Sequence, residues 1–204
     1  MKTYQMAKTE RKKIDKVLFA IVLAAGESKR FGSTKQLAKL NDQALVTNAV
    51  RLSERVCNER SILVTGHDWK KVTHQCRSLK GFFILNSNFQ AGIATSICAG
   101  IESTPAVADA ALILLADQPL ITIEHLNKLK SVWLECPNSI VTTSYANTAG
   151  PPVIFPRSYF NMLATLEGDR GAKDLINNPN NRAELINFEK AVVDIDRIED
   201  LDCL

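Results

Sequence analysis

The sequence predicts a single α/β domain of three layers, in which helices cover both faces of a mostly parallel β-sheet. Short apolar runs rich in β-branched residues alternate with segments of helical spacing through most of the chain. Single helices between such strands imply right-handed crossovers, which make the joined strands parallel. The length of 204 residues suits one well-buried domain better than two.

The predicted elements follow one another in this alternating order. We expect strands at 17–23, 60–65, 81–85, 110–116 and 139–144, and helices at 42–56, 68–79, 93–101 and 122–135, the last with Thr122 as its N-cap. After residue 144 the alternation ends. A strand at 153–155, helices at 158–166 and 172–177, and short strands at 184–188 and 191–194 are expected there. We interpret this part as an elaboration that returns to the main sheet.

The positive charge of the chain is concentrated at its start. Residues 1–16 contain six basic and two acidic residues and so carry a net charge of +4, whereas the whole chain carries +3. The remaining residues therefore sum to −1. We expect residues 1–16 to form a flexible basic extension and residues 17–204 to form the domain, with neither a nucleic acid nor a membrane as partner.

Targeting signals and cysteines indicate the compartment. The basic start lacks the apolar core of a signal peptide, and no run in the chain is long and apolar enough to span a membrane. The five cysteines are odd in number and scattered, without a Cys-x-x-Cys pair. Reduced thiols account for this pattern, so we expect a cytoplasmic protein.

The most informative segment is Leu-Ala-Ala-Gly-Glu-Ser-Lys-Arg-Phe-Gly-Ser-Thr-Lys at 23–35, directly after the first strand. Its small residues let backbone N–H groups approach a ligand, and two spaced cations can neutralise phosphate oxygens. The spacing matches neither a Walker loop nor the dinucleotide fingerprint. It predicts a nucleoside triphosphate site whose candidate ligands are Leu23, Ala24, Ala25, Gly26, Ser28, Arg30 and Lys35.

Two further polar positions follow predicted parallel strands. Gly66 closes the strand at 60–65, and Asp117 ends the apolar run 111–116. In open α/β sheets the ligand lies beyond the carboxyl ends of the strands, so these positions should meet the segment 23–35. A carboxylate after a buried strand needs a partner, and Mg²⁺ favours one or two carboxylates together with phosphate oxygens.

The spaced residues at 23–35 resemble the signature Leu-Ala-Ala-Gly-x-Ser-x-Arg-hydrophobic-Gly-x-x-Lys of the MobA-like nucleotidyltransferases. Within that superfamily the chain looks closest to the molybdenum-cofactor cytidylyltransferase branch. The resemblance runs from about residue 17 to 201 and implies a Rossmann-like nucleotidyltransferase sheet. It also implies catalytic roles for Arg30 and Lys35, because these match the basic positions of the signature.

The resemblance assigns the metal ligands as well. Asp117 lies in an Asp-Gln-Pro sequence similar to the family's metal motif, and the closing segment 194–201 resembles Asp-Ile-Asp-Thr-Pro-Glu-Asp-Leu. This implies Asp196 as the second ligand of Mg²⁺, although Arg197-Ile198 replaces the usual Thr-Pro. From the residues alone, alternation in an extended segment places Asp194 and Asp196 on the same side, so either carboxylate could reach the site.

Three weaker motifs complete the resemblance. Segment 86–96 is similar to an Asn-x-x-aromatic-x-x-Gly-x-x-x-Ser stretch and implies that Asn86 and Ser96 contact the nucleotide. Segment 168–173 is similar to Gly-Asp-x-Gly-Ala-Arg and implies acceptor contacts from Arg170 and Lys173. Gly150 begins a Gly-Pro-Pro sequence where the family has Gly-His-Pro, so the usual histidine is missing from this part of the acceptor site.

The expected function is transfer of CMP from CTP to the phosphate of a molybdopterin-type molybdenum cofactor, with Mg²⁺ as cofactor and release of pyrophosphate. Ala25 favours a pyrimidine nucleotide, because the guanylyltransferase branch typically has a second glycine at that position. Alternatives are guanylyl transfer, transfer to a sugar phosphate, and a non-catalytic accessory protein that delivers cofactor to a molybdoenzyme or its chaperone.

Overall fold

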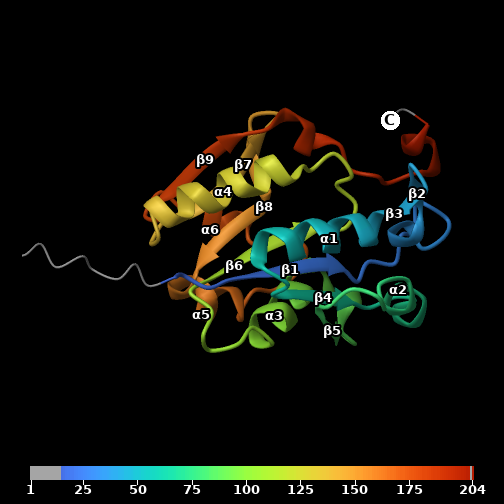
Figure 1. Ribbon diagram of the computed structural model, residues 1–204, viewed down its shortest axis with the longest axis horizontal. Helices are drawn as coiled ribbons and strands as arrows, with labels where there is room; N and C mark the ends of the chain where they lie inside the picture. Colours follow the sequence, from blue (N-terminus) through green and yellow to red (C-terminus); the bar gives the residue numbers. More distant parts are fainter. Residues whose placement is uncertain (1–14, 203) are drawn as a thin grey trace, which may run out of the picture.

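The computed structural model of the chain describes residues 15–202 and 204. A seven-stranded sheet with the order β5-β4-β1-β6-β8-β7-β9 forms its centre (Figure 1). The strands are β1 Leu18–Ala24, β4 Ser61–Thr65, β5 Phe82–Leu85, β6 Ala110–Leu115, β7 Ile140–Tyr145, β8 Thr148–Pro156 and β9 Ala183–Asn187. Only β8 runs antiparallel to its two neighbours, so the predicted mostly parallel sheet is confirmed.

Helices cover both faces of this sheet, which confirms the three-layer α/β/α architecture. The helices are α1 Leu45–Cys57, α2 Trp69–Gln75, α3 Ile93–Glu102, α4 Ile123–Glu135, α5 Phe160–Leu163 and α6 Lys173–Asn177. Residues of α1, α2 and α4 share one buried cluster, and residues of α3, α5 and α6 share the other. None of the helices among the described residues is both long and apolar enough to cross a membrane.

Alternation along β1 connects the two cores. Ala20 and Val22 belong to the cluster under α1 and α4, whereas Ile21 and Leu23 belong to the cluster under α3. All seven residues of β1 are buried, as expected for a central strand covered on both faces. Packing on both faces therefore fixes the position of β1 and, with it, the start of the segment that follows this strand.

The predicted N-cap of α4 is confirmed: the Thr122 side chain accepts a hydrogen bond from the backbone N–H of His125. Two other predictions were wrong. Residues 191–194 form no strand, because the chain turns into a 3₁₀ helix at Glu189–Val192. Residues 158–166 form only a short 3₁₀ turn and the four-residue α5.

A small hairpin was not predicted. It consists of β2 Lys39–Leu40 and β3 Gln43–Ala44, and α1 begins only after it. Its turn residues Asn41 and Asp42 both have positive φ angles, of 51° and 60°, which these short polar side chains tolerate. The proposed basic extension, residues 1–16, lies outside the described residues except for its last two.

Candidate nucleotide and metal site

A cavity of about 510 Å³ opens at the carboxyl ends of β1 and β6. These strands are parallel neighbours, with Leu23 paired to Leu115, so the segments that follow them begin side by side. The cavity is lined by residues of the segments 23–36 and 89–96, by the end of β6, and by Asp196 near the end of the chain. Asp117 and the segment after β1 meet here, as the fold class requires, whereas Gly66 does not line the cavity.

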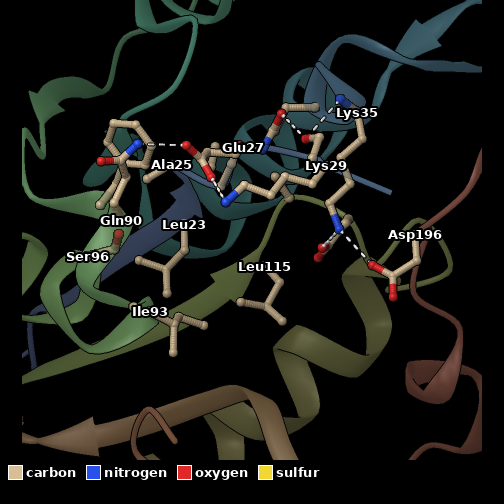
Figure 2. A pocket seen from close by; sticks show the side chains of 18 of the residues that line it. Leu23, Ala25, Glu27, Lys29, Lys35, Gln90, Ile93, Ser96, Leu115 and Asp196 are labelled. Atoms are coloured by element: carbon tan, nitrogen blue, oxygen red, sulfur yellow. Dashed lines mark hydrogen bonds and ion pairs between the residues drawn. The ribbon is translucent and has the colours of Figure 1, made fainter. Parts of the chain in front are cut away.

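Lys35 lies at the centre of the charged half of the cavity. Its Nζ is 2.6 Å from Oδ2 of Asp117 and 3.1 Å from Oδ1 of Asp196 (Figure 2). Only 14% of the lysine side chain is exposed. Desolvation disfavours its ammonium, but attraction by Asp117 and Asp196 outweighs it and raises the pKa of Lys35 above its usual value.

Arg30, at the rim of the cavity, pairs with the carboxylate of Asp196. Its Nη2 is 2.8 Å from Oδ2 of Asp196, and 70% of its side chain is exposed. An exposed ion pair of this kind contributes little to stability, so the arginine exchanges partners at small cost. The structure thus brings together the four charged residues that the sequence singled out, namely Arg30, Lys35, Asp117 and Asp196.

A small apolar cluster positions the side-chain carboxylate of Asp196. Phe31 of the first segment packs with Leu45 and the fully buried Ile195. The backbone N–H of Ile195 also donates to the carbonyl oxygen of Asp117 at 3.0 Å. These contacts fix residue 195 beside the end of β6, and the next side chain, Asp196, therefore points to Lys35 across the cavity (Figure 2).

Asp200 caps the closing segment, in which Arg197-Ile198 replaces Thr-Pro. Its Oδ2 accepts the backbone N–H groups of Asp196 at 2.8 Å and Arg197 at 2.7 Å. The 3₁₀ helix Ile198–Leu201 begins at this cap. Asp194 lies nearby, where desolvation and then repulsion by Asp117 raise its pKa to about 6.

The donor set fits a hard divalent cation. Asp117 and Asp196 each offer a carboxylate oxygen to one shared ammonium, so the pair already binds a cation between them. Mg²⁺ prefers one or two carboxylates and completes its shell with water and phosphate oxygens. No group of three or more His, Cys, Asp or Glu residues suited to a metal occurs in 15–202 and 204.

Gln36 holds the segment after β1 in its turn, a role that the sequence did not reveal. It is 97% buried, its Nε2 donates to the carbonyl oxygen of Gly26, and its Oε1 accepts the Ser28 hydroxyl. Ser28 has a φ of 57°, and its Oγ accepts the backbone N–H of Lys35. The sequence feature that could have indicated this role is the position of Gln36 directly after Lys35, the candidate catalytic lysine.

The other half of the cavity is mainly apolar. Leu23, Ile93 and Leu115 point into it, with Ser96 beside them and Gln90 at the rim (Figure 2). Glu27, which also lines the cavity, accepts a hydrogen bond from Gln90 at 2.8 Å. It also forms an ion pair with Lys29 at 2.6 Å. The hydrogen bond from Gln90 links the segment before α3 to the segment after β1.

Asn86 and Gly66 lie behind the lining rather than in it. The buried Asn86 amide donates to the hydroxyls of Thr95 and Ser96, so it orients the start of α3. A Cβ at Gly66 would come within 2.7 Å of the Ala25 carbonyl oxygen and 2.8 Å of the Phe89 ring. Both residues thus support the cavity through packing and hydrogen bonds.

The candidate acceptor residues are not part of the cavity lining. Arg170 is 83% exposed and pairs loosely with Asp174 at 3.8 Å, and Lys173 begins the exposed side of α6. Gly150 packs in β8 against the Tyr145 hydroxyl. From the same 168–173 segment it is Asp169 that lines the cavity, a residue that the sequence analysis did not single out.

Comparison with known proteins places the chain among relatives. A family model described as the MobA-like NTP transferase domain matches residues 20–184. The chain is 28% identical over 167 residues to the purine catabolism protein PucB of Bacillus subtilis (strain 168), a match covering 78% of this chain and 80% of PucB.

Two solved structures share the fold over nearly the whole chain. The first is the homolog of Mycobacterium tuberculosis Rv0371c from Mycobacterium sp. strain JC1, with a TM-score of 0.77 and 26% identity over 91% of this chain and 93% of that one. The second is Rv0371c of M. tuberculosis H37Rv in complex with manganese, with a TM-score of 0.72 and 22% identity over 92% of this chain and 97% of that one.

Proposed function

The chain belongs to the MobA-like NTP transferase family, and from that premise we propose that it transfers CMP from CTP to the phosphate of a molybdopterin-type molybdenum cofactor. The observation that carries the proposal is the convergence of two cations and two carboxylates on one cavity, at the carboxyl ends of β1 and β6. A nucleotidyltransferase needs this combination, because its substrates are polyanions and its cofactor is a divalent cation.

The reaction is an in-line displacement at phosphorus. An oxygen of the acceptor phosphate attacks the α-phosphorus of CTP, the bond from that phosphorus to the bridging oxygen breaks, and pyrophosphate leaves with the electron pair. The attacking oxygen is already anionic, so no protein nucleophile is required. Catalysis then depends on positioning and on cations that neutralise the phosphoryl oxygens.

Arg30 and Lys35 supply that neutralisation in the proposal. Arg30 at the exposed rim would hold the triphosphate, and Lys35, deeper in the cavity, would stabilise charge at the α-phosphate. The backbone of residues 24–26 and Ser28, which Gln36 holds in its turn, would cradle the phosphates. Losing one such contact to the transition state costs roughly 10²–10³-fold in rate.

The apolar half of the cavity would take the cytosine. Leu23 and Ala25 lie on one side of it, and Ser96 offers a hydroxyl that the base or ribose can use. Ala25 stands where the guanylyltransferase branch has glycine, so its methyl group reduces the space for a purine. Asn86 and Gly66 contribute indirectly, because they position Ser96 and the segment that carries Ala25.

Asp117 and Asp196 would hold Mg²⁺. When bound, the cation supplies charge neutralisation at the triphosphate and orients it. The manganese complex of Rv0371c supports a divalent cation in this fold, although its 22% identity carries the likeness no further than the fold. The two-carboxylate donor set is the support from this chain itself.

The acceptor would approach from the side of segment 168–173 and Gly150. Asp169 lines the cavity, whereas Arg170 and Lys173 are exposed outside it, and Arg170 would exchange its loose pair with Asp174 for an anionic group of the acceptor. The product would pass to a molybdoenzyme or its chaperone. The scattered cysteines of the sequence support a cytoplasmic location for the reaction.

An assay of pyrophosphate release tests the proposal against its main rival. With CTP, Mg²⁺ and molybdopterin-type cofactor, the protein should release pyrophosphate, and omission of either the acceptor or the metal should stop the release. A non-catalytic accessory protein would bind these molecules without releasing pyrophosphate. Release with a sugar phosphate in place of the cofactor would keep the chemistry and change the acceptor.

A further inference from the structure

We propose that the ammonium of Lys35 and the divalent cation compete for the same two carboxylates, so that entry of the metal displaces Lys35 from Asp117 and Asp196. The inference rests on the proposed function, because it concerns the metal of that reaction. It assigns Lys35 a second role, as an internal cation that holds the carboxylate pair together until a metal replaces it.

The geometry of the three side chains carries the argument. One Nζ atom contacts Oδ2 of Asp117 at 2.6 Å and Oδ1 of Asp196 at 3.1 Å, so it lies between the two oxygens that a metal would use. The ammonium therefore fills the position of a bridging cation. A metal held by both carboxylates would have to share them with this ammonium, and two positive charges so close together repel each other strongly.

Lys35 can leave without disturbing the fold. Its backbone is fixed, because its N–H donates to Ser28 Oγ and the residue begins a 3₁₀ helix at Lys35–Leu37. The four-carbon side chain, in contrast, is flexible and ends in a charge that can point elsewhere. The rest of the cavity, lined by the segment after β1, offers room for this movement toward bound phosphates.

The competition couples metal and nucleotide. A triphosphate gives the displaced ammonium a new anionic partner, so nucleotide binding should free the carboxylates and strengthen metal binding. By reciprocity, the metal should strengthen nucleotide binding by the same factor. Metal alone should bind the wild-type protein weakly, because it must break two ion pairs without compensation.

A titration with Mn²⁺ alone tests this without nucleotide or acceptor. Binding of Mn²⁺ to the full chain is followed by the loss of the free-ion signal in electron paramagnetic resonance, for wild type, Lys35→Met and Lys29→Met. Lys29 is the matched control. It lines the same cavity and carries the same charge, but its Nζ pairs with Glu27 and has no ion pair with either aspartate.

The proposal expects Lys35→Met to bind Mn²⁺ at least about tenfold more tightly than wild type, within the range of typical coupling between sites. Lys29→Met should gain far less, since it removes only a general electrostatic contribution. Equal or weaker Mn²⁺ binding by Lys35→Met, or an equal gain in both variants, overturns the proposal.

A measurement on the wild-type protein covers the case in which Lys35→Met does not fold. Lysines are labelled with acetic anhydride with and without saturating Mn²⁺, and each site is quantified by peptide mass spectrometry. Mn²⁺ should increase the labelling of Lys35, because release from the carboxylates exposes the amine. Labelling of Lys29 should stay unchanged. Unchanged labelling of Lys35 at saturating Mn²⁺ contradicts the displacement.

These outcomes are independent of turnover. If the protein fails to release pyrophosphate from CTP, the proposed function fails, but Mn²⁺ binding to the two carboxylates and its competition with Lys35 remain measurable. If turnover is found and the Mn²⁺ titrations show no competition, the proposed function stands and this inference fails.

Discussion

At the scale of single residues, the site depends on carboxylates gathered around one largely buried lysine. Lys35 is buried on six-sevenths of its side-chain surface, and the attraction of Asp117 and Asp196 more than offsets the cost of that burial for its ammonium. Because its ion-pair partners are side chains of the cavity itself, this ammonium lies where it can form a new ion pair with a substrate phosphate.

Replacement of Lys35 by alanine should reduce turnover strongly and preserve the fold. The side chain makes only ion pairs in the cavity and is absent from the hydrophobic clusters. We expect kcat/KM for pyrophosphate release to fall by roughly 10²-fold or more, the typical loss for an electrostatic contact to the transition state. Near-normal turnover in a variant with native circular dichroism would remove Lys35 from the mechanism.

The carboxylates give a second prediction. Asp117→Asn and Asp196→Asn should each abolish turnover and weaken Mg²⁺-dependent binding of CTP, measured by calorimetry, because a neutral amide is a poor substitute for a charged ligand. Asp42→Asn, at the exposed turn of the β2–β3 hairpin, is the control and should have no effect. If Asp194→Asn abolishes activity while Asp196→Asn retains it, the assignment of the closing motif is wrong by one alternation.

At the scale of elements, the ends of strands position the site. The segment after β1 lies against the end of β4, where the backbone N–H of His67 donates to the Ala25 carbonyl oxygen at 3.0 Å. The absence of a side chain at Gly66 permits this approach. Packing between elements thus determines the shape of the nucleotide cradle.

A methyl group at Gly66 should therefore disturb both stability and binding. Gly66→Ala would press against Ala25 and Phe89, and overpacking of this kind typically costs about 1–3 kcal/mol. We expect a lower melting temperature together with weaker CTP binding. Gly81→Ala is a matched control, because its Cβ would clash with Ser61 at the far end of the sheet. It should lower the melting temperature alone, and equal CTP affinities of the two variants would contradict this role of Gly66.

His125 on α4 predicts a pH dependence of stability. Its ring is 95% buried, its Nε2 lies 2.8 Å from Thr143 Oγ1, and it stacks on Phe188 at 4.3 Å. Because the Thr143 hydroxyl donates to the Pro152 carbonyl oxygen, it accepts from His125, whose Nε2 therefore carries a proton. Desolvation lowers the pKa of His125 from 6.5 to about 4.

The direction of the change in stability with pH follows from the protons that the folded and unfolded states bind. Between pH 6.5 and 4 the unfolded chain binds a proton at His125 that the folded protein does not, so stability falls as the pH falls through this window. The loss amounts to roughly 2–3 kcal/mol across the window. In denaturant unfolding at pH 7 and pH 4.5, His125→Gln should lose less stability than wild type. Equal losses would show that His125 is not held neutral.

The sequence predicts elements well where the pattern is local. The apolar runs of β1, β4 and β6 are buried on both faces, so their composition alone identifies them. Residues 191–194, with two valines, suggest a strand equally well. There, however, the carbonyl oxygen of Ala191 accepts a hydrogen bond from Gln118 at 2.9 Å instead of pairing with a strand. This partner is 73 residues away, so the local pattern cannot reveal it.

At the scale of the whole molecule, the fold brings together residues that are far apart in the chain. Lys35 and Asp196 are separated by 161 positions and meet because Phe31, Leu45 and Ile195 pack together. The motifs of the sequence identified the four charged residues that form ion pairs with one another in the cavity, namely Arg30, Lys35, Asp117 and Asp196. They did not identify Gln36, Glu27, Gln90 or Asp169, whose roles depend on contacts between segments with no characteristic spacing.

The central claim is that this cavity joins CMP to a molybdopterin-type acceptor, and the identity of the product tests it most directly. The protein is incubated with equal concentrations of CTP and GTP, Mg²⁺ and the acceptor, and the products are weighed by mass spectrometry. In such a competition the product ratio reports the ratio of the two kcat/KM values. We predict that the CMP adduct predominates. A predominant GMP adduct would contradict the choice of nucleotide, and the absence of any adduct with both nucleotides intact would contradict the transferase assignment itself.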